Sequence, residues 1–262
     1  MVNKLPVRWY RIARTCAHLL EGVGTTMLVF PLVNDARKRR LVKRWSVRLL
    51  RILNVKASVT GDLSPAAGNV MLVANHVSWL DIFVLNAHLP VRFVAKSELA
   101  RWPVVSRMIR GAGTVFIERE RRRDTHRVNK HMADVLANGD VVAIFPEGTT
   151  THGHEVLPFK SSLLQPIIEA GGHLQPVALR YRTTDGEIAM APTYVGDTSF
   201  AESFLAVCAE RSLSVNLTAC PALAARDEHR RTLARAAEAS IRTALAGSAP
   251  ATAPGTRADR AA

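Results

Sequence analysis

A histidine and an aspartate five positions apart, His76 and Asp81, are the side chains of this chain best suited to chemistry. An imidazole can take the proton from an attacking hydroxyl, and a carboxylate bonded to the other ring nitrogen fixes the tautomer and stabilises the cation that forms. The same spacing also arises by chance, with the histidine in a turn and the aspartate in the first turn of a helix. Other motifs along the chain decide between the two interpretations.

The residues on either side of the pair predict a corner between a strand and a helix. The apolar run 70–74 is typical of a buried strand, and residues 79–89 have the pattern of a helix. Loops at such corners carry function on many α/β scaffolds. Ser78 lies in this corner, but no Gly-x-Ser-x-Gly sequence surrounds it, so a turn or capping role is predicted rather than a nucleophile.

Three further apolar strands are predicted at residues 113–117, 141–145 and 175–179. The first is followed by Arg119, whose guanidinium can bind an anion. The second opens into a Pro/Gly turn, Glu147-Gly148-Thr149, with free backbone N–H groups expected. A base, an anion-binding fork and such a turn are the parts needed to acylate a hydroxyl on a phosphate-bearing acceptor.

Together these segments resemble the blocks of the glycerolipid acyltransferase family. They follow the family's Asn-His-x4-Asp, Gly-x-x-Phe-Ile-x-Arg, Phe-Pro-Glu-Gly-Thr and apolar-Pro-apolar patterns, in order, from Asn75 to Leu179. The resemblance implies an α/β fold with a mixed central sheet wrapped by helices, and an N-terminal membrane-associating helical segment. It also implies transfer of a fatty acyl group from a thioester to the free hydroxyl of a lysolipid, with no covalent acyl-enzyme and no cofactor.

The same resemblance assigns roles to individual residues. It implies that His76 is the general base and Asp81 its orienting partner, while Arg119 binds the acceptor's phosphate with help from the turn Glu147-Gly148-Thr149. The residues implied to bind substrate are Asn75, Phe116, Arg119, Glu147, Gly148, Thr149 and Lys160.

The acceptor expected from the resemblance is 1-acyl-sn-glycerol-3-phosphate, which gives phosphatidic acid in phospholipid biosynthesis. The third block of the family commonly continues from Thr149 into an arginine, whereas residues 150–153 here read Thr-Thr-His-Gly. Lyso-ornithine lipid or another lysophospholipid therefore stays open as acceptor. Lys160 either replaces the lost charge or lies along the surface at a helix start. The donor is acyl-CoA or acyl carrier protein, and the sequence does not decide between them.

Two histidines near the third block, His152 and His154, raise the question of a metal. Zinc sites usually add cysteine or further histidine at regular spacing, and Cys16, Cys208 and Cys220 lie far apart. We expect an exposed active-site loop and no metal.

The N-terminal part predicts contact with a membrane. Residues 17–33 are apolar but contain Glu21 and Pro31, so they fail as a span of about 20 apolar residues and fit a short helix or helical hairpin at the interface. Residues 37–51 predict a basic amphipathic helix that lies on an anionic leaflet, apolar face inward; the alternative is a cationic helix packed against the domain. The expected location is the cytoplasmic face of the inner (plasma) membrane, peripheral or monotopic.

Composition fits one catalytic domain but admits rival classes. The net charge of +13 is compatible with nucleic-acid binding, yet aromatic residues make up only 6% and no nucleic-acid motif is visible, so no such partner is expected. A lipid-binding scaffold without catalysis is the other rival. The predicted organisation is membrane-docking helices at 1–55, a catalytic domain at 56–246 and a disordered tail at 247–262. Further helices are predicted at 126–138, 159–170 and 227–246, and further strands at 188–191 and 214–217.

Overall fold

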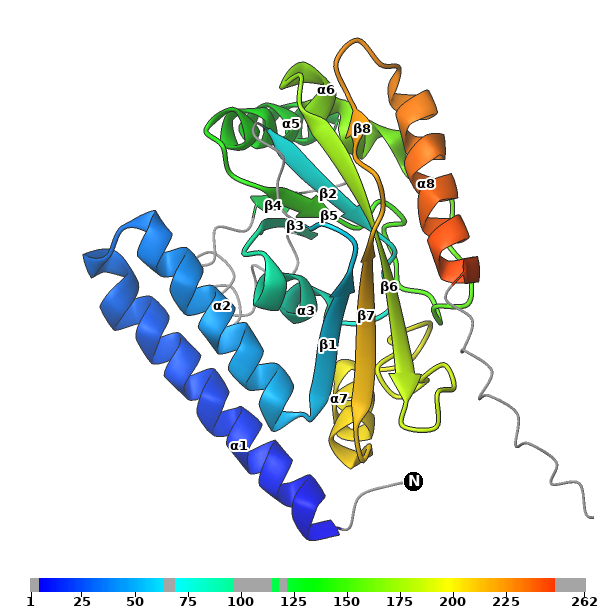
Figure 1. Ribbon diagram of the computed structural model, residues 1–262. Helices are drawn as coiled ribbons and strands as arrows, with labels where there is room; N and C mark the ends of the chain where they lie inside the picture. The colour runs from blue at the N-terminus through cyan, green and yellow to red at the C-terminus, as the bar shows by residue number, and fades with distance from the viewer. Residues whose placement is uncertain (1–4, 64–68, 97–114, 118–121, 248–262) are drawn as a thin grey trace, which may run out of the picture.

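One twisted sheet organises the chain in the computed structural model, which describes residues 5–63, 69–96, 115–117 and 122–247 (Figure 1). The strands lie in the order β1-β7-β6-β2-β5-β3-β4, and β8 also pairs with β6. Their bounds are β1 (Val55–Thr60), β2 (Val70–Ala74), β3 (Arg92–Lys96), β4 (Val115–Ile117), β5 (Val142–Ile144), β6 (His173–Thr183), β7 (Leu213–Ala219) and β8 (Leu223–Ala224).

The position of β2 in the centre of the sheet explains why residues 70–74 of the sequence are all apolar. All five of its residues are buried, because helices cover both faces of the sheet. Val70 and Leu72 point into one core, and Met71 and Val73 point into the other, as the alternation of a strand requires. The fold is therefore the mixed α/β architecture that the sequence predicts.

Strand direction brings the motif-bearing loops to one edge. Each strand in the series β6-β2-β5-β3-β4 is parallel to the next one, while β7 runs antiparallel to β6. The carboxyl ends of β2, β5 and β4 therefore lie along the same edge of the sheet. The residues that follow β2 and β5 are those that carry the first and third motifs.

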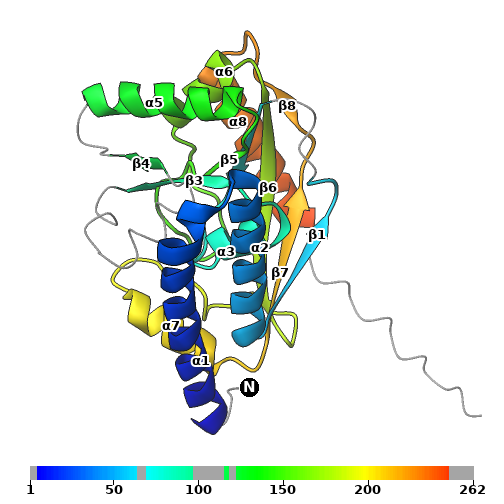
Figure 2. The same cartoon turned by 90° about the vertical axis from the view of Figure 1, so that its left-hand side faces the viewer.

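Helices form a layer on each side of the sheet (Figures 1 and 2). Buried residues of α2 and α3 belong to one core, and buried residues of α5, α6 and α8 belong to the other. In both views α1 runs beside α2, outside the first layer. The helices are α1 (Leu5–Gly24), α2 (Asp35–Ile52), α3 (Asp81–His88), α5 (Arg122–Ala137), α6 (Gln165–Glu169), α7 (Phe200–Ala209) and α8 (Arg230–Gly247).

The N-terminal segment is a helical hairpin with α1 and α2 as its arms, which is larger than the short helix or hairpin predicted within residues 17–33. Short turns of π and 3-10 helix, Thr25–Val29 and Phe30–Leu32, join α1 to α2, and the Asn34 side chain caps α2 by accepting the N–H of Arg37 at 3.0 Å. In the described part of the chain, we find no helix that combines the length and the apolar character needed to cross a bilayer.

The prediction that the apolar face of α2 enters a membrane is wrong. Leu49 and Leu50 are 2% and 4% exposed and lie in the protein core, and Trp45 packs against the same core. The amphipathic pattern of this helix therefore serves packing against the domain, which is the alternative interpretation. An apolar stripe on a helix is buried by whichever apolar surface is available, and here the fold supplies one.

Two other predicted elements differ from the structure. The helix predicted at 159–170 is divided into a 3-10 turn, Ser161–Leu164, and the short α6, because Pro166 lacks an N–H and so fits only the first turn of a helix. The strand predicted at 188–191 is reduced to a single bridge between Arg182 and Ile188. Pro192 follows this segment and cannot donate to a ladder. The predicted tail, apart from Gly247, lies outside the described residues.

Candidate active site

The corner after β2 is fastened to β6 by a side chain. Asn75 Nδ2 donates to the carbonyl of Leu179 at 3.0 Å, and Asn75 Oδ1 accepts the N–H of Leu179 at 2.7 Å. The amide thus continues the pairing of the two strands one residue beyond Ala74, where the register of the backbone ladder ends. This sets the point at which the chain leaves the sheet.

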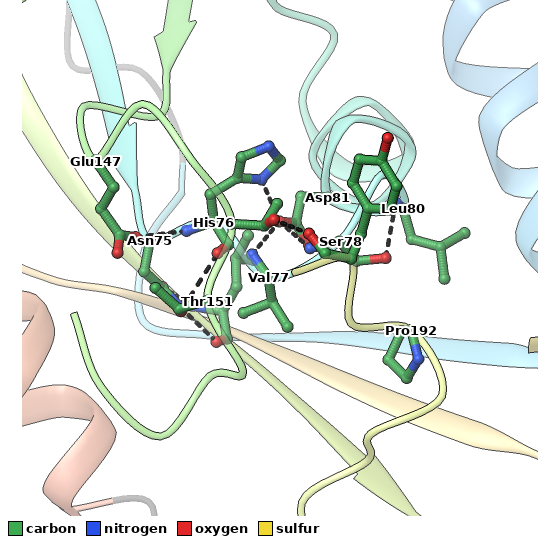
Figure 3. A network of polar contacts seen from close by, with 12 residues as sticks. Asn75, His76, Val77, Ser78, Leu80, Asp81, Glu147, Thr151 and Pro192 are labelled. Carbon is green, nitrogen blue, oxygen red and sulfur yellow. Dashed lines mark hydrogen bonds and ion pairs between the residues drawn. The ribbon is translucent and has the colours of Figure 1, made fainter. Parts of the chain in front are cut away.

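His76 and Asp81 lie in direct contact, as Figure 3 shows. Nδ1 of His76 is 2.8 Å from Oδ2 of Asp81, whose side chain is fully buried, while the histidine side chain is 21% exposed. The backbone N–H groups of Val77 and Ser78 also donate to Oδ2, at 2.8 and 3.0 Å, and Tyr181 Oη donates to Oδ1 at 2.7 Å. These donors stabilise an ionised carboxylate.

An ionised Asp81 fixes the tautomer of His76. Because the carboxylate can only accept, Nδ1 of the imidazole must donate, and the lone pair of the neutral ring is then on Nε2. The ring is also fixed from its face, since it stacks on Phe145 with centroids 4.1 Å apart and planes at 12°. The arrangement can therefore remove a proton at one defined atom, Nε2.

Glu147, from the turn after β5, supports the backbone of the corner. Its Oε1 accepts the N–H of His76 at 2.8 Å (Figure 3). Its Oε2 accepts the N–H of Leu157 at 2.8 Å. The residue is only 3% exposed. Burial raises the pKa of Glu147 above its ordinary value, the charge of Asp81 adds to this, and the two N–H donors and His76 oppose it.

The loop after Glu147 returns to the same corner. The N–H of Thr151 donates to the carbonyl of His76 at 2.8 Å. Gly153 has a φ of +80°, and a Cβ there would lie 3.3 Å from Cγ2 of Val77. A residue with a side chain would be strained in this backbone conformation, so glycine lets the loop close on the turn that follows His76.

The structure separates the predicted substrate-binding residues into groups. Asn75 is fully buried and its amide is committed to β6, and the two oxygens of Glu147 are committed to backbone N–H groups. The prediction of free N–H groups in the turn is wrong for Gly148, which donates to the carbonyl of Phe145 at 3.1 Å. Thr149 and Lys160 are exposed.

The second motif lies at the margin of the described residues. Arg119 lies outside them, and for Phe116 the structure describes the backbone, as part of β4. The register of β4 against β3 places Phe116 opposite Ala95. The carboxyl end of β4 is at the sheet edge where His76 lies, so the roles of Phe116 and Arg119 stay predictions that the strand order is compatible with.

Ser78 has the turn role that the sequence predicts. The residue is buried, its N–H donates to Asp81, and its Oγ accepts the N–H of Leu80 at 3.2 Å. His152 and His154 are exposed, as expected of the loop. Within the part of the chain that the structure describes, no three His, Cys, Asp or Glu side chains gather into a group that could hold a metal ion.

Tyr181 is the residue of this network that the sequence motifs did not single out. Its signal is the alternation of Val177, Leu179 and Tyr181, which places an aromatic hydroxyl on the buried face of an apolar strand. A buried tyrosine hydroxyl needs a hydrogen-bond partner. That partner, Asp81, is one hundred residues away in the chain.

Comparisons with known proteins agree with this geometry. The model of the family described as Acyltransferase matches residues 56–180. The chain is 37% identical to 1-acyl-sn-glycerol-3-phosphate acyltransferase of Neisseria meningitidis over 77% of this chain and 79% of that protein. It is 36% identical to lyso-ornithine lipid O-acyltransferase of Pseudomonas aeruginosa over 81% of each. The fold matches the crystal structure of PlsC, the 1-acyl-sn-glycerophosphate acyltransferase of Thermotoga maritima, with a TM-score of 0.73 and 20% identity, over 95% of this chain and 98% of that one. The chain belongs to the Acyltransferase family and is an O-acyltransferase.

Proposed function

We propose that the protein transfers a fatty acyl group from a thioester to the free hydroxyl of a lysolipid, with His76 as general base and Asp81 as its orienting partner. The observation that carries this is the 2.8 Å contact between His76 Nδ1 and the buried carboxylate of Asp81, which leaves Nε2 as the basic atom. Nε2 takes the proton of the acceptor hydroxyl as its oxygen attacks the thioester carbonyl carbon. The carbon–sulfur bond then breaks, and the thiol leaves with that proton or as the thiolate.

The acceptor we propose first is 1-acyl-sn-glycerol-3-phosphate, with phosphatidic acid as product. The Neisseria relatives, at 37% and 40% identity, carry that name. A lyso-ornithine lipid is the second candidate, because relatives at 36% and 34% identity are named for it and because Thr150 follows Thr149 where the resemblance expects an arginine. In either case we propose that Arg119 binds the acidic part of the acceptor, with acyl-CoA or acyl carrier protein as donor.

We further propose that the N-terminal hairpin docks the enzyme on the membrane that holds the acceptor. Ten of the thirteen exposed large hydrophobic residues in the described part of the chain lie between residues 5 and 32. Among them, Leu20, Leu28 and Leu32 are 72%, 72% and 83% exposed. An exposed apolar surface of this kind is typical of an interface with lipid. We place the protein on the anionic cytoplasmic face of the inner membrane, peripheral or monotopic.

The experiment offers the purified full-length protein a panel of lysolipids with acyl-CoA and with acyl carrier protein, and identifies each product by mass spectrometry. The panel includes 1-acyl-sn-glycerol-3-phosphate, other lysophospholipids and a lyso-ornithine lipid. One acylated lysolipid formed in preference to the rest identifies the acceptor. No acylated product from any pair would contradict the proposal.

Variants assign the roles. His76→Ala and Asp81→Ala should each lower kcat by at least about 100-fold with folding intact, since base catalysis contributes factors of that order. His152→Ala, an exposed histidine of the neighbouring loop, is the matched control and should keep wild-type turnover. Arg119→Ala should chiefly raise the KM for the acceptor. Unchanged turnover in Asp81→Ala would show that the dyad assignment is wrong.

A further inference from the structure

We infer that Tyr181 is a positioning residue for catalysis, which holds Asp81 in the orientation and charge state that His76 requires. The inference rests on the proposed function, because it assigns to Tyr181 a part in the same dyad. It also lies beyond the family match, which ends at residue 180.

The hydrogen bonds of Asp81 divide unequally between its two oxygens. Oδ2 accepts from Nδ1 of His76 and from the N–H groups of Val77 and Ser78. Oδ1 accepts from Tyr181 Oη at 2.7 Å. The carboxylate is fully buried, so solvent cannot replace the phenol. Loss of that donor would leave a charged oxygen desolvated and would free the carboxylate to rotate about its bond to Cβ.

The sheet explains why a tyrosine of β6 reaches the first turn of α3. β2 ends at Ala74, opposite Val177, whereas β6 continues to Thr183. Tyr181 is four residues beyond Val177 on the same face of β6, and this face packs on the core that contains α3. Tyr181 is 2% exposed, so the position of its ring is set by packing and its hydroxyl has little freedom to turn away.

The phenol stays a donor throughout the working range of pH. Burial raises the pKa of Tyr181 well above its ordinary value, and the charge of Asp81 and the hydrogen bond to it raise it further. A neutral phenol beside a carboxylate can only donate to it. The Tyr181 hydroxyl therefore stabilises the charged form of Asp81 without adding a charge of its own.

The charged and titratable groups recorded in interaction with Asp81 are His76 from the corner, Glu147 from the turn after β5 and Tyr181 from β6. Removal of the Tyr181 hydroxyl would leave Oδ1 without its recorded donor. The carboxylate that orients His76 would then be less well fixed, so kcat should fall while substrate binding changes little.

The first test is Tyr181→Phe, which keeps the ring and removes the hydroxyl. We expect kcat to fall about 5- to 20-fold and the KM values to stay within about 2-fold. Tyr194→Phe is the control, because Tyr194 is a partly exposed tyrosine outside the dyad and its variant should behave as wild type. A wild-type kcat in Tyr181→Phe would overturn the inference.

A double-mutant cycle separates this inference from the proposed function. If Tyr181 acts through Asp81, Asp81→Asn and Asp81→Asn/Tyr181→Phe should have the same kcat. If the losses in kcat of the two single variants multiply in the double variant, the inference is overturned. It is also overturned if Asp81→Asn has a lowered kcat while Tyr181→Phe is fully active. Wild-type turnover in both single variants would instead contradict the dyad itself.

A measurement on the wild-type protein covers the case in which Tyr181→Phe does not fold. The chain has three tyrosines, so labelling with 13C at Cζ gives three resonances, assigned with Tyr10→Phe and Tyr194→Phe. We expect the Tyr181 signal to show no phenol ionisation in the range of pH where exposed tyrosines ionise, and to move when Asp81 is replaced by Asn. A Tyr181 signal that ionises near pH 10, or that is insensitive to the dyad, would overturn the inference.

Discussion

The carboxylate of Glu147 accepts the backbone N–H of His76 at 2.8 Å, so the turn after β5 holds the backbone of the histidine at the end of β2. The other oxygen of Glu147 accepts the N–H of Leu157, which ties the returning loop to the same side chain. Both hydrogen bonds, to the N–H of His76 and to the N–H of Leu157, are partly buried. Glu147, which the family resemblance marks for substrate binding, is thus placed by its contacts as a support for the backbone of His76.

Glu147→Gln should lower both stability and turnover. A glutamine side chain has one carbonyl oxygen and one NH₂ group, so one of the two backbone N–H groups would face a donor and lose its partner. We expect a loss of about 1–3 kcal/mol in the free energy of unfolding, the cost of one buried unsatisfied group, and a lower kcat. Glu155→Gln, at an exposed position of the same loop, is the matched control and should change neither quantity. Denaturant unfolding and steady-state kinetics measure both, and a variant with wild-type stability would contradict the support role.

The raised pKa of Glu147 also predicts a pH dependence of stability. Burial is the largest cause of the shift, so the folded state binds this proton more tightly than the unfolded chain does. The contribution of Glu147 to stability is therefore fully present below its ordinary pKa and declines as pH rises through the raised value. The difference in unfolding free energy between wild type and Glu147→Gln should fall across that window. A difference that rises there would mean that the hydrogen bonds outweigh burial.

Asn75→Ala distinguishes a structural role from substrate binding. The amide of Asn75 makes both of its recorded bonds to the backbone of Leu179, at 2.7 and 3.0 Å, in a fully buried site. Removing it leaves a buried N–H and a buried carbonyl without these partners, so we expect a loss of about 2 kcal/mol or more in stability. The KM for the acceptor should stay near the wild-type value in the fraction that folds. A large increase in KM at wild-type stability would restore Asn75 to the substrate site.

The sequence was sufficient to predict features that depend on near neighbours. Val70–Ala74 is an apolar run of strand length, and the structure has β2 at those residues. The contact between His76 and Asp81 spans one turn, so a strand-to-helix corner brings the two together. The boundary at Pro166 could also have been predicted, because proline fits only the first turn of a helix. The prediction instead placed a single helix across this residue.

Features that depend on strand order were not predictable. The bonds of Asp81 to Tyr181 and of His76 to Glu147 join residues 100 and 71 positions apart, and they exist because β2 lies between β6 and β5. No local pattern fixes that order. The environment of α2 is a related case, since the same apolar stripe fits a bilayer or a protein core, and only the packed structure shows that Leu49 and Leu50 are in the core.

Membrane docking predicts that exposed leucines at the tip of the hairpin carry lipid affinity. Leu28→Ser/Leu32→Ser removes two side chains that are 72% and 83% exposed, so folding should be unaffected. Loss of their apolar area should reduce partition onto anionic phospholipid vesicles about 10- to 100-fold in a sedimentation assay. Met190→Ser, at an exposed position outside the hairpin, is the control. Wild-type partition of the double variant onto vesicles would contradict docking by this tip. If the wild-type protein instead binds mixed-sequence DNA at physiological salt and does not bind vesicles, a nucleic-acid-binding protein is favoured.

The three cysteines report on the docking of α1 against α7. Cys16 is exposed, whereas Cys208 and Cys220 are buried, and burial raises the pKa of Cys208 to about 11. At pH 8 only about one Cys208 thiol in a thousand would be ionised, so Cys16 should be the one thiol that reacts quickly with a disulfide reagent in native protein. Cys16→Ser should abolish that phase.

Loosening α1 should expose the slow thiol. The Arg11 guanidinium donates to the carbonyls of Cys208, Glu210 and Arg211 at the end of α7, at 3.4, 2.5 and 3.1 Å. In a Cys16→Ser background, Arg11→Met keeps the aliphatic stem but leaves these carbonyls without their donor, so we expect Cys208 to react at least about 5-fold faster through local opening. Arg14→Met on the same helix is the control and should react at the background rate. Equal rates in the two variants would mean that α1 is held on α7 by its apolar contacts rather than by Arg11.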